Sequence, residues 1–388
     1  CILGHVHWEP SDAVKIGAGN VKISDLTISS AGSISGNGDG IELVSNIINI
    51  TMSARLTGNK LTVARNTINA NDWSVTGSDL TLAQNTISPR GKEVHSNGNS
   101  CNITTNAING TLWLTGSSNR IIGNSYEALF CPQGDSNVIS YNSGPISLGN
   151  SAHSCSNNII SGNLIKGPSV WGIWIGAHCN SNLFIDNYIA DEGYDPIGDA
   201  FNTAINFGGD KSIGTNNTFY HNAFVNNQAN VKFNNGMVIS GNNWNNTIQG
   251  NYWSDYNDSD ADGDGLGDTP YIINSANSDG HPLIAQPFDM PTINVPPPVY
   301  NPPITISDAM LTQPSTPTPT INPKQSATNN KPATQSTTPN SPSSPQTIPE
   351  YATVTILLLA LTIAVVAVVI ALRLKKPIPE NGLHQTAS

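Results

Sequence analysis

The chain has 388 residues, only 11% of them charged, and a formal net charge of -11 at pH 7. An acidic protein cannot replace the counterions on nucleic-acid phosphates, so this balance excludes nucleic acid as a partner. Gly and Asn are abundant while Leu, Glu and Lys are scarce, which excludes a mainly helical protein and favours an all-β fold.

One short pattern recurs through the first 250 residues: an apolar residue, two further residues, an asparagine, one residue and a second apolar residue. Leu43 to Ile48 and Val63 to Ile68 are two of the copies. Successive asparagines of the pattern, from Asn46 to Asn187, lie 20, 19, 21, 18, 18, 21 and 24 residues apart. A repeat of this length predicts one turn of a β-solenoid per copy.

We therefore predict a right-handed parallel β-helix over residues 1–252, in which short strands turn alternate apolar side chains inward. The asparagines should stack as a hydrogen-bonded ladder, and each should adopt the left-handed backbone that a sharp bend needs. A β-sandwich is the alternative, although it gives no reason for so regular a spacing. The predicted ladder consists of Asn46, Asn66, Asn85, Asn106, Asn124, Asn142, Asn163, Asn187, Asn222 and Asn251.

Four tryptophans are candidates for binding sugar rings by stacking. Trp73 and Trp113 each lie seven residues after a ladder asparagine, and Trp171 and Trp174 follow Asn163. Flat aromatic faces along a solenoid suit carbohydrate ligands. The alternative is that these side chains pack in the core.

Two cysteines and two histidines form a candidate soft-metal set. Cys155 and Cys179 each precede a ladder asparagine by eight residues, with His153 and His178 close in the sequence. This spacing places the thiols in neighbouring turns, and Cys and His are ligands for copper or zinc. A disulfide or a simple stacked pair of thiols is the alternative.

A long loop is predicted over residues 190–209, because the spacing between ladder asparagines stretches to 35 there. It carries Asp191, Glu192, Asp195 and Asp199, which are candidate catalytic acids for polysaccharide cleavage. The loop lacks Lys and Arg, so a solvated acidic loop is the alternative.

An Asp/Gly-rich run within residues 253–290 predicts a calcium site. Its acids alternate with small residues, which lets one loop wrap oxygen atoms around a hard cation. The candidate ligands are Asp258, Asp260, Asp262, Asp264 and Asp268. A solvated acidic turn is the alternative.

The C-terminal quarter predicts a membrane anchor. Residues 291–349 are rich in Pro, Thr and Ser and predict a disordered stalk. Residues 351–372 carry no charge and would span about 33 Å as a helix, so we predict a transmembrane helix over 350–372. Basic residues follow at once, which predicts a cytoplasmic tail at 373–388 and a head outside the cell. Six Asn-x-Ser/Thr sequons suit an exported glycoprotein.

Several motifs together resemble a known family. The asparagine repeat, the Gly250 to Tyr256 segment, the Asp/Gly run and the His281 to Leu283 segment are similar to NosD-like right-handed β-helix proteins of archaeal surfaces. The Asp/Gly run resembles thrombospondin type 3 calcium repeats. The resemblance implies a pectin lyase-like fold, with copper-site maturation, carbohydrate binding or sugar hydrolysis as possible activities.

These observations favour a non-enzymatic, membrane-anchored surface protein that binds glycans or other envelope components. The alternatives are a polysaccharide lyase or hydrolase that uses the acidic loop, and a copper-delivery factor that uses the Cys and His set.

Overall fold

The computed structural model describes residues 12–150, 153–167, 171–191, 203–208, 214–233 and 240–293, and the backbone of 304–307. The chain divides into two units, 1–316 and 317–388, and all described residues belong to the first. Among them no helix is long and apolar enough to span a bilayer. The predicted membrane helix, the tail and most of the predicted stalk lie outside these residues.

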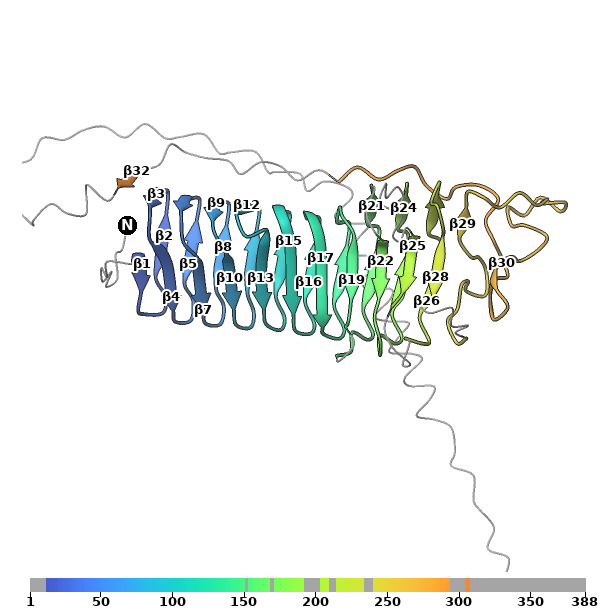
Figure 1. Ribbon diagram of the computed structural model, residues 1–388, viewed down its shortest axis with the longest axis horizontal. Helices are drawn as coiled ribbons and strands as arrows, with labels where there is room; N and C mark the ends of the chain where they lie inside the picture. Colours follow the sequence, from blue (N-terminus) through green and yellow to red (C-terminus); the bar gives the residue numbers. More distant parts are fainter. Residues whose placement is uncertain are drawn as a thin grey trace, which may run out of the picture. The chain divides into compact units, whose positions relative to one another are not determined.

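The described unit is a parallel β-solenoid of stacked turns (Figure 1). The turns pass through three faces, most of them with one strand on each, and every strand pairing between turns is parallel. Parallel crossovers of this kind are right-handed. The structure thus confirms the all-β fold, the parallel solenoid and the stacked turns that the repeat predicts.

Face one contains most of the five-residue strands. It consists of β1 (Asp12–Ile16), β4 (Ser33–Asn37), β7 (Ala54–Thr57), β10 (Trp73–Thr76), β13 (Glu93–Asn97), the second halves of β15 (Ala107–Thr115) and β17 (Ser125–Gln133), β19 (Ile146–Leu148), β22 (Trp171–Ile175), β25 (Thr203–Phe207) and β28 (Val231–Phe233).

Face two is a ten-stranded sheet. Its strands are β2 (Lys22–Ser24), β5 (Glu42–Val44), β8 (Thr62–Ala64), β11 (Thr81–Ala83), β14 (Asn102–Thr104), β16 (Arg120–Ile122), β18 (Val138–Ser140), β20 (Ile159–Ser161), β23 (Leu183–Ile185) and β26 (Thr218–Tyr220).

Face three contains β3 (Leu26–Ser30), β6 (Ile47–Ile50), β9 (Thr67–Ala70), β12 (Thr86–Pro89), the first halves of β15 and β17, β21 (Leu164–Lys166), β24 (Tyr188–Ala190), β27 (Ala223–Val225) and β29 (Tyr252–Trp253). An antiparallel hairpin follows, formed by β30 (Tyr271–Asn274) and β31 (Asn277–Asp279). In the segment predicted as stalk, β32 (Ile304–Ser307) pairs in parallel with β3.

Two sharp corners in each turn place face two between the other faces. At each corner one residue has a left-handed backbone, and the next residue points into the core. The prediction that the ladder asparagine itself is left-handed is wrong, because the preceding residue, such as Ser45 (φ 58°) or Arg65 (φ 55°), makes the bend. The asparagine is therefore needed for its amide rather than for its backbone freedom.

The corner between faces two and three, called corner two, holds the predicted ladder from Asn46 to Asn251. In every step the Nδ2 of one asparagine donates to the Oδ1 of the next at 2.9–3.1 Å. The backbone N–H of the same asparagine donates to that oxygen as well, for example from Asn66 to Asn85 at 2.9 Å. Each buried amide is thus satisfied by the next turn.

A second ladder, which we did not predict, fills the corner between faces one and two, called corner one. The inward residues there are apolar in the first turns and become asparagines from Asn119 onward. Backbone N–H groups donate to the Oδ1 atoms of the following turn at 2.8–3.0 Å. Its members are Asn119, Asn137, Asn158, Asn182, Asn217 and Asn242.

The segment after the last turn closes the solenoid. Asp279 is fully buried, and its Oδ2 accepts hydrogen bonds from the Asn251 backbone N–H at 2.7 Å and from Trp253 Nε1 at 2.9 Å. A carboxylate accepts hydrogen bonds without donating any, so it suits the end of a ladder whose donors all point toward it. Tyr271 stacks on Trp253 with ring centroids 4.3 Å apart, which covers the last turn of the core.

Candidate ligand-binding face

The outward side chains of face one form a register-matched row, called the outer row. Parallel pairing sets each member beside its equivalent in the next turn. From the first turn onward the row consists of Lys15, Ser35, Arg55, Ser74, His95, Trp113, Phe130, Ser147, Trp174, Asn206 and Lys232. Turns stack about 4.8 Å apart, so the row from Lys15 to Trp174 is about 38 Å long.

The middle of the outer row is aromatic. The His95 and Trp113 rings stack with centroids 5.9 Å apart and an interplanar angle of 17°. Trp113 also contacts Phe130, with ring centroids 4.3 Å apart. The Phe130 ring is tilted by 54° to that of Trp113. These three rings are partly exposed on consecutive turns, so face one carries a continuous aromatic run.

Trp174 continues this surface two turns further on. Its indole ring lies against Gly176 and Gly208, where a Cβ atom would stand only 2.7 Å and 2.1 Å from the ring. Glycine at these two positions therefore lets the ring lie against the sheet. Beside it, the buried polar atoms of Ser147 and Asn206 have no hydrogen-bond partner in the described part of the chain.

Trp73 does not belong to this surface, although it has the same spacing from its ladder asparagine as Trp113. Its side chain is 0% exposed and its register partner is Val94 in the core. In the 18-residue turn that begins at Asn106, the corner before face one is shorter by a residue, and a shift of one residue exchanges the inner and outer faces of a strand. Trp73 is therefore a core residue, whereas Trp171 is partly exposed at the start of β22.

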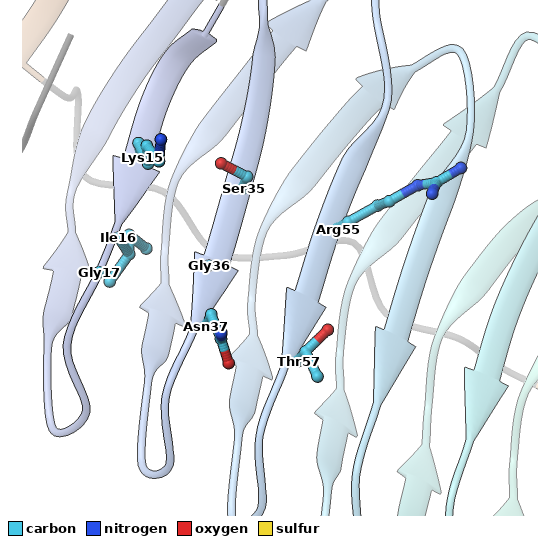
Figure 2. Close-up of a pocket in the computed structure, with 8 residues that line it drawn as sticks. All are labelled: Lys15, Ile16, Gly17, Ser35, Gly36, Asn37, Arg55 and Thr57. Carbon is cyan, nitrogen blue, oxygen red and sulfur yellow. The ribbon is translucent and has the colours of Figure 1, made fainter. Parts of the chain in front are cut away.

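A hollow of about 340 Å³ lies at the first turns of the same face (Figure 2). Its lining comes from three neighbouring strands, β1, β4 and β7, and from the residue after β1. Lys15 and Arg55 supply two cations, and Ser35, Asn37 and Thr57 supply polar groups. The basic end of the outer row is thus also its hollow end.

The acidic loop is only partly described. Asp191 is exposed and pairs with Lys166 at 3.6 Å beyond the end of face three. Glu192, Asp195 and Asp199 lie outside the described residues. The loop prediction was too long at its C-terminal end, because residues 203–207 form β25, whose Ile205 and Phe207 are buried in the core.

The cysteines lie together in the core, whereas the two histidines lie at the surface. Cys155 and Cys179 are fully buried, whereas His153 and His178 are exposed. Cys131, which sequence spacing placed in another register, lies with its Sγ 3.5 Å from that of Cys155. The hydrogen bond with Cys131 raises the pKa of the Cys155 thiol, and the bond with Cys155 raises that of Cys179, so both thiols are held in the protonated form.

The acids of the Asp/Gly run fall into two groups. Asp260, Asp262 and Asp264 hold their carboxylate oxygens within 4.8 Å of one another, and they are the one such group of His, Cys, Asp and Glu in the described chain. Asp268 instead accepts hydrogen bonds from Ser259 Oγ and the Ala261 backbone, and Asp258 accepts one from Thr269. The bond from Thr269 lowers the pKa of Asp258. Of the five predicted ligands, three thus form a carboxylate cluster, and the other two accept hydrogen bonds within the same loop.

The outer row could have been predicted from the sequence, but not from the spacing to the ladder asparagines alone. The residues of one outer row alternate with buried apolar neighbours, so aligning Val94, Leu112 and Leu129 brings His95, Trp113 and Phe130 together. No protein-family model and no curated protein matches this chain.

Proposed function

We propose that face one binds an extended glycan chain along the outer row, and that the protein acts by binding rather than by catalysis. The observation that carries this proposal is the aromatic run of His95, Trp113 and Phe130 on consecutive turns. Sugar rings present C–H groups that stack on aromatic faces. A row about 38 Å long suits a polymer better than a small molecule.

The binding proposal is favoured over the enzyme because the outer row contains no Asp or Glu. Hydrolysis of a glycosidic bond needs two carboxyl groups placed across one sugar, and a lyase of this fold would need a basic residue beside acids that hold calcium. The nearest acid to the aromatic run, Glu93, is already paired with His95 at 3.1 Å.

The place of action in this proposal is a cell surface. The apolar segment at 350–372 and the basic residues after it support a single membrane span with the solenoid outside. The resemblance to NosD-like archaeal surface proteins supports the same location. A surface solenoid would then present face one to glycans of the envelope or of the surroundings.

The test is a polysaccharide array probed with the full chain and scored for retention and for new reducing or unsaturated ends. We expect retention without cleavage, and about ten-fold weaker binding by Trp113→Ala, since removing one stacked ring costs about 1.4 kcal/mol. Tyr141→Ser is the matched control, because Tyr141 is 60% exposed but lies at corner two. Unchanged binding by Trp113→Ala, or release of new chain ends, would contradict the proposal.

We also propose that the cluster of Asp260, Asp262 and Asp264 binds Ca²⁺ and stiffens the segment that closes the solenoid. Three converging carboxylates repel one another without a cation and suit calcium, which prefers oxygen ligands. At 100 times its Kd, calcium should stabilise the folded chain by about 2.7 kcal/mol.

Thermal unfolding with calcium and with a chelator tests this site. We expect calcium to raise the Tm of the native chain and to leave that of the double variant Asp262→Ala, Asp264→Ala unchanged. Asp25→Asn is the control, since Asp25 is exposed at corner two and asparagine tolerates its left-handed backbone. An equal calcium-dependent rise in Tm for the double variant would rule the site out.

A further inference from the structure

The hollow sets two cations close together on one face of an acidic chain. Lys15 and Arg55 are both exposed, and neither forms an ion pair with any residue that the structure describes. Two other lysines, in contrast, are paired: Lys22 with Glu42 at 3.0 Å and Lys92 with Glu127 at 2.8 Å. The positive charge of the hollow is therefore available to a ligand.

Two acids near face one form hydrogen bonds with serines and no ion pair with Lys15 or Arg55 among the described residues. Asp12, on the same strand as Lys15, accepts a hydrogen bond from Ser33 Oγ at 2.6 Å. Asp72, in the turn after the Arg55 strand, accepts one from Ser53 Oγ at 3.1 Å. Asp12 is the first residue of β1 and Asp72 directly precedes β10, so neither carboxylate belongs to the outer row.

The hollow also has room for a charged group of a ligand that lies along the outer row. Figure 2 shows Lys15, Ser35 and Arg55 on three successive strands, with Asn37 and Thr57 beside them. Ser35 is small and lies between the two cations in the register, so it leaves room and offers a hydroxyl. Lys15 and Arg55 are two turns apart, about 9.6 Å along the axis, which is comparable with the length of a disaccharide unit.

We propose that this hollow binds the anionic groups of an acidic glycan. Lys15 and Arg55 each bind a carboxylate or sulfate, on two sugars whose spacing matches two turns of the solenoid. The inference rests on the proposed glycan binding and adds its substrate class: the aromatic run holds sugar rings of any kind, and the hollow selects chains that carry acid groups. Arginine pairs with carboxylate and sulfate through two parallel N–H bonds, and lysine acts as a point charge.

The experiment compares the full chain with the double variant Lys15→Gln, Arg55→Gln on three polymers: a uronic-acid polysaccharide, its carboxyl-reduced neutral form and a sulfated form of that neutral polymer. The control Lys60→Gln, Arg120→Gln removes the same charge from exposed cations elsewhere on the solenoid. We expect the hollow variant to bind the acidic polymers about ten-fold more weakly and the neutral polymer equally well, and the control to match the native chain. The native advantage for acidic polymers should shrink at high salt.

The outcomes separate the two proposals. Binding of the neutral polymer that Trp113→Ala weakens about ten-fold supports the proposed function whatever the hollow does. Equal loss of acidic binding in the hollow variant and the control would reduce the effect to net charge and overturn the hollow. Equal binding of acidic and neutral polymers by the native chain would overturn it too. A difference between the uronic and sulfated arms would identify which anion the hollow prefers.

Discussion

The two corners that flank face two share one backbone geometry but hold different side chains. In both, a left-handed residue precedes an inward one, as Lys60 precedes Leu61 at corner one and Arg65 precedes Asn66 at corner two. Corner two keeps asparagine from the second turn to the last. Corner one begins with apolar residues and changes to asparagine halfway along.

The difference shows that the corner accepts two solutions to one problem. The N–H of the inward residue points along the axis, and an asparagine in the next turn supplies an acceptor for it. An apolar residue supplies packing but no acceptor. Corner one is less well satisfied where it changes over, because the Nδ2 atoms of Asn119 and Asn137 are buried without partners in the described chain.

The largest expected effect comes from replacing one asparagine of each corner in the same turn. Asn142→Leu should destabilise the chain by about 4 kcal/mol, because Asn142 Nδ2 donates to Ile121 O and Asn163 Oδ1, and its loss leaves buried groups unpaired. Asn137→Leu should cost less, about 2 kcal/mol, since its Nδ2 has no partner to lose and the variant removes only Oδ1, which accepts from the Asn119 N–H at 2.8 Å. Denaturant unfolding measures both, and equal costs would remove the distinction between the corners.

A smaller effect should follow from extending the second ladder toward the N-terminus. Leu61→Asn buries an amide beside Leu80 and should cost about 3 kcal/mol. Adding Leu80→Asn gives the new amide an acceptor, so the double variant should be about 1 kcal/mol more stable than the sum of the single effects predicts. A double-mutant cycle checks this, and strict additivity would show that corner one cannot hold a ladder there.

The smallest effect concerns the acceptor at the end of corner two. Burial raises the pKa of Asp279, so its contribution to stability is full below the ordinary aspartate pKa and is lost as pH rises through the raised value. Relative to Asp279→Asn, which does not titrate, the native chain should gain stability as pH falls through this window. Unfolding of both chains from pH 7 to pH 4 measures the difference, and a pH-independent difference would show that Asp279 titrates normally.

The sequence predicted the fold and one ladder because both follow from a pattern that repeats along the chain at a nearly constant spacing. Each asparagine from Asn46 to Asn251 follows an apolar residue by three positions, so its place in the turn could be inferred without coordinates. The second ladder left a weaker trace: Asn119, Asn137 and Asn158 each precede a ladder asparagine by five residues, but the earlier turns hold Ile, Leu or Cys there.

The candidate sites were harder to predict, because they depend on small local changes in length. Trp73 and Trp113 share one offset from their asparagines, yet a corner shorter by one residue puts the first inside and the second outside. Cys131 joins Cys155 although their offsets differ, since they come from adjacent positions of neighbouring turns.

By itself, the sequence determined that this chain is a parallel β-solenoid with an asparagine ladder. The same short pattern occurs about ten times, and similar segments adopt the same local conformation and stack on one another. The tertiary structure alone decided which side chains meet on the outer surface. A one-residue change in a corner is invisible to composition and barely alters the period, but it turns a strand over and thereby selects the face that a ligand meets.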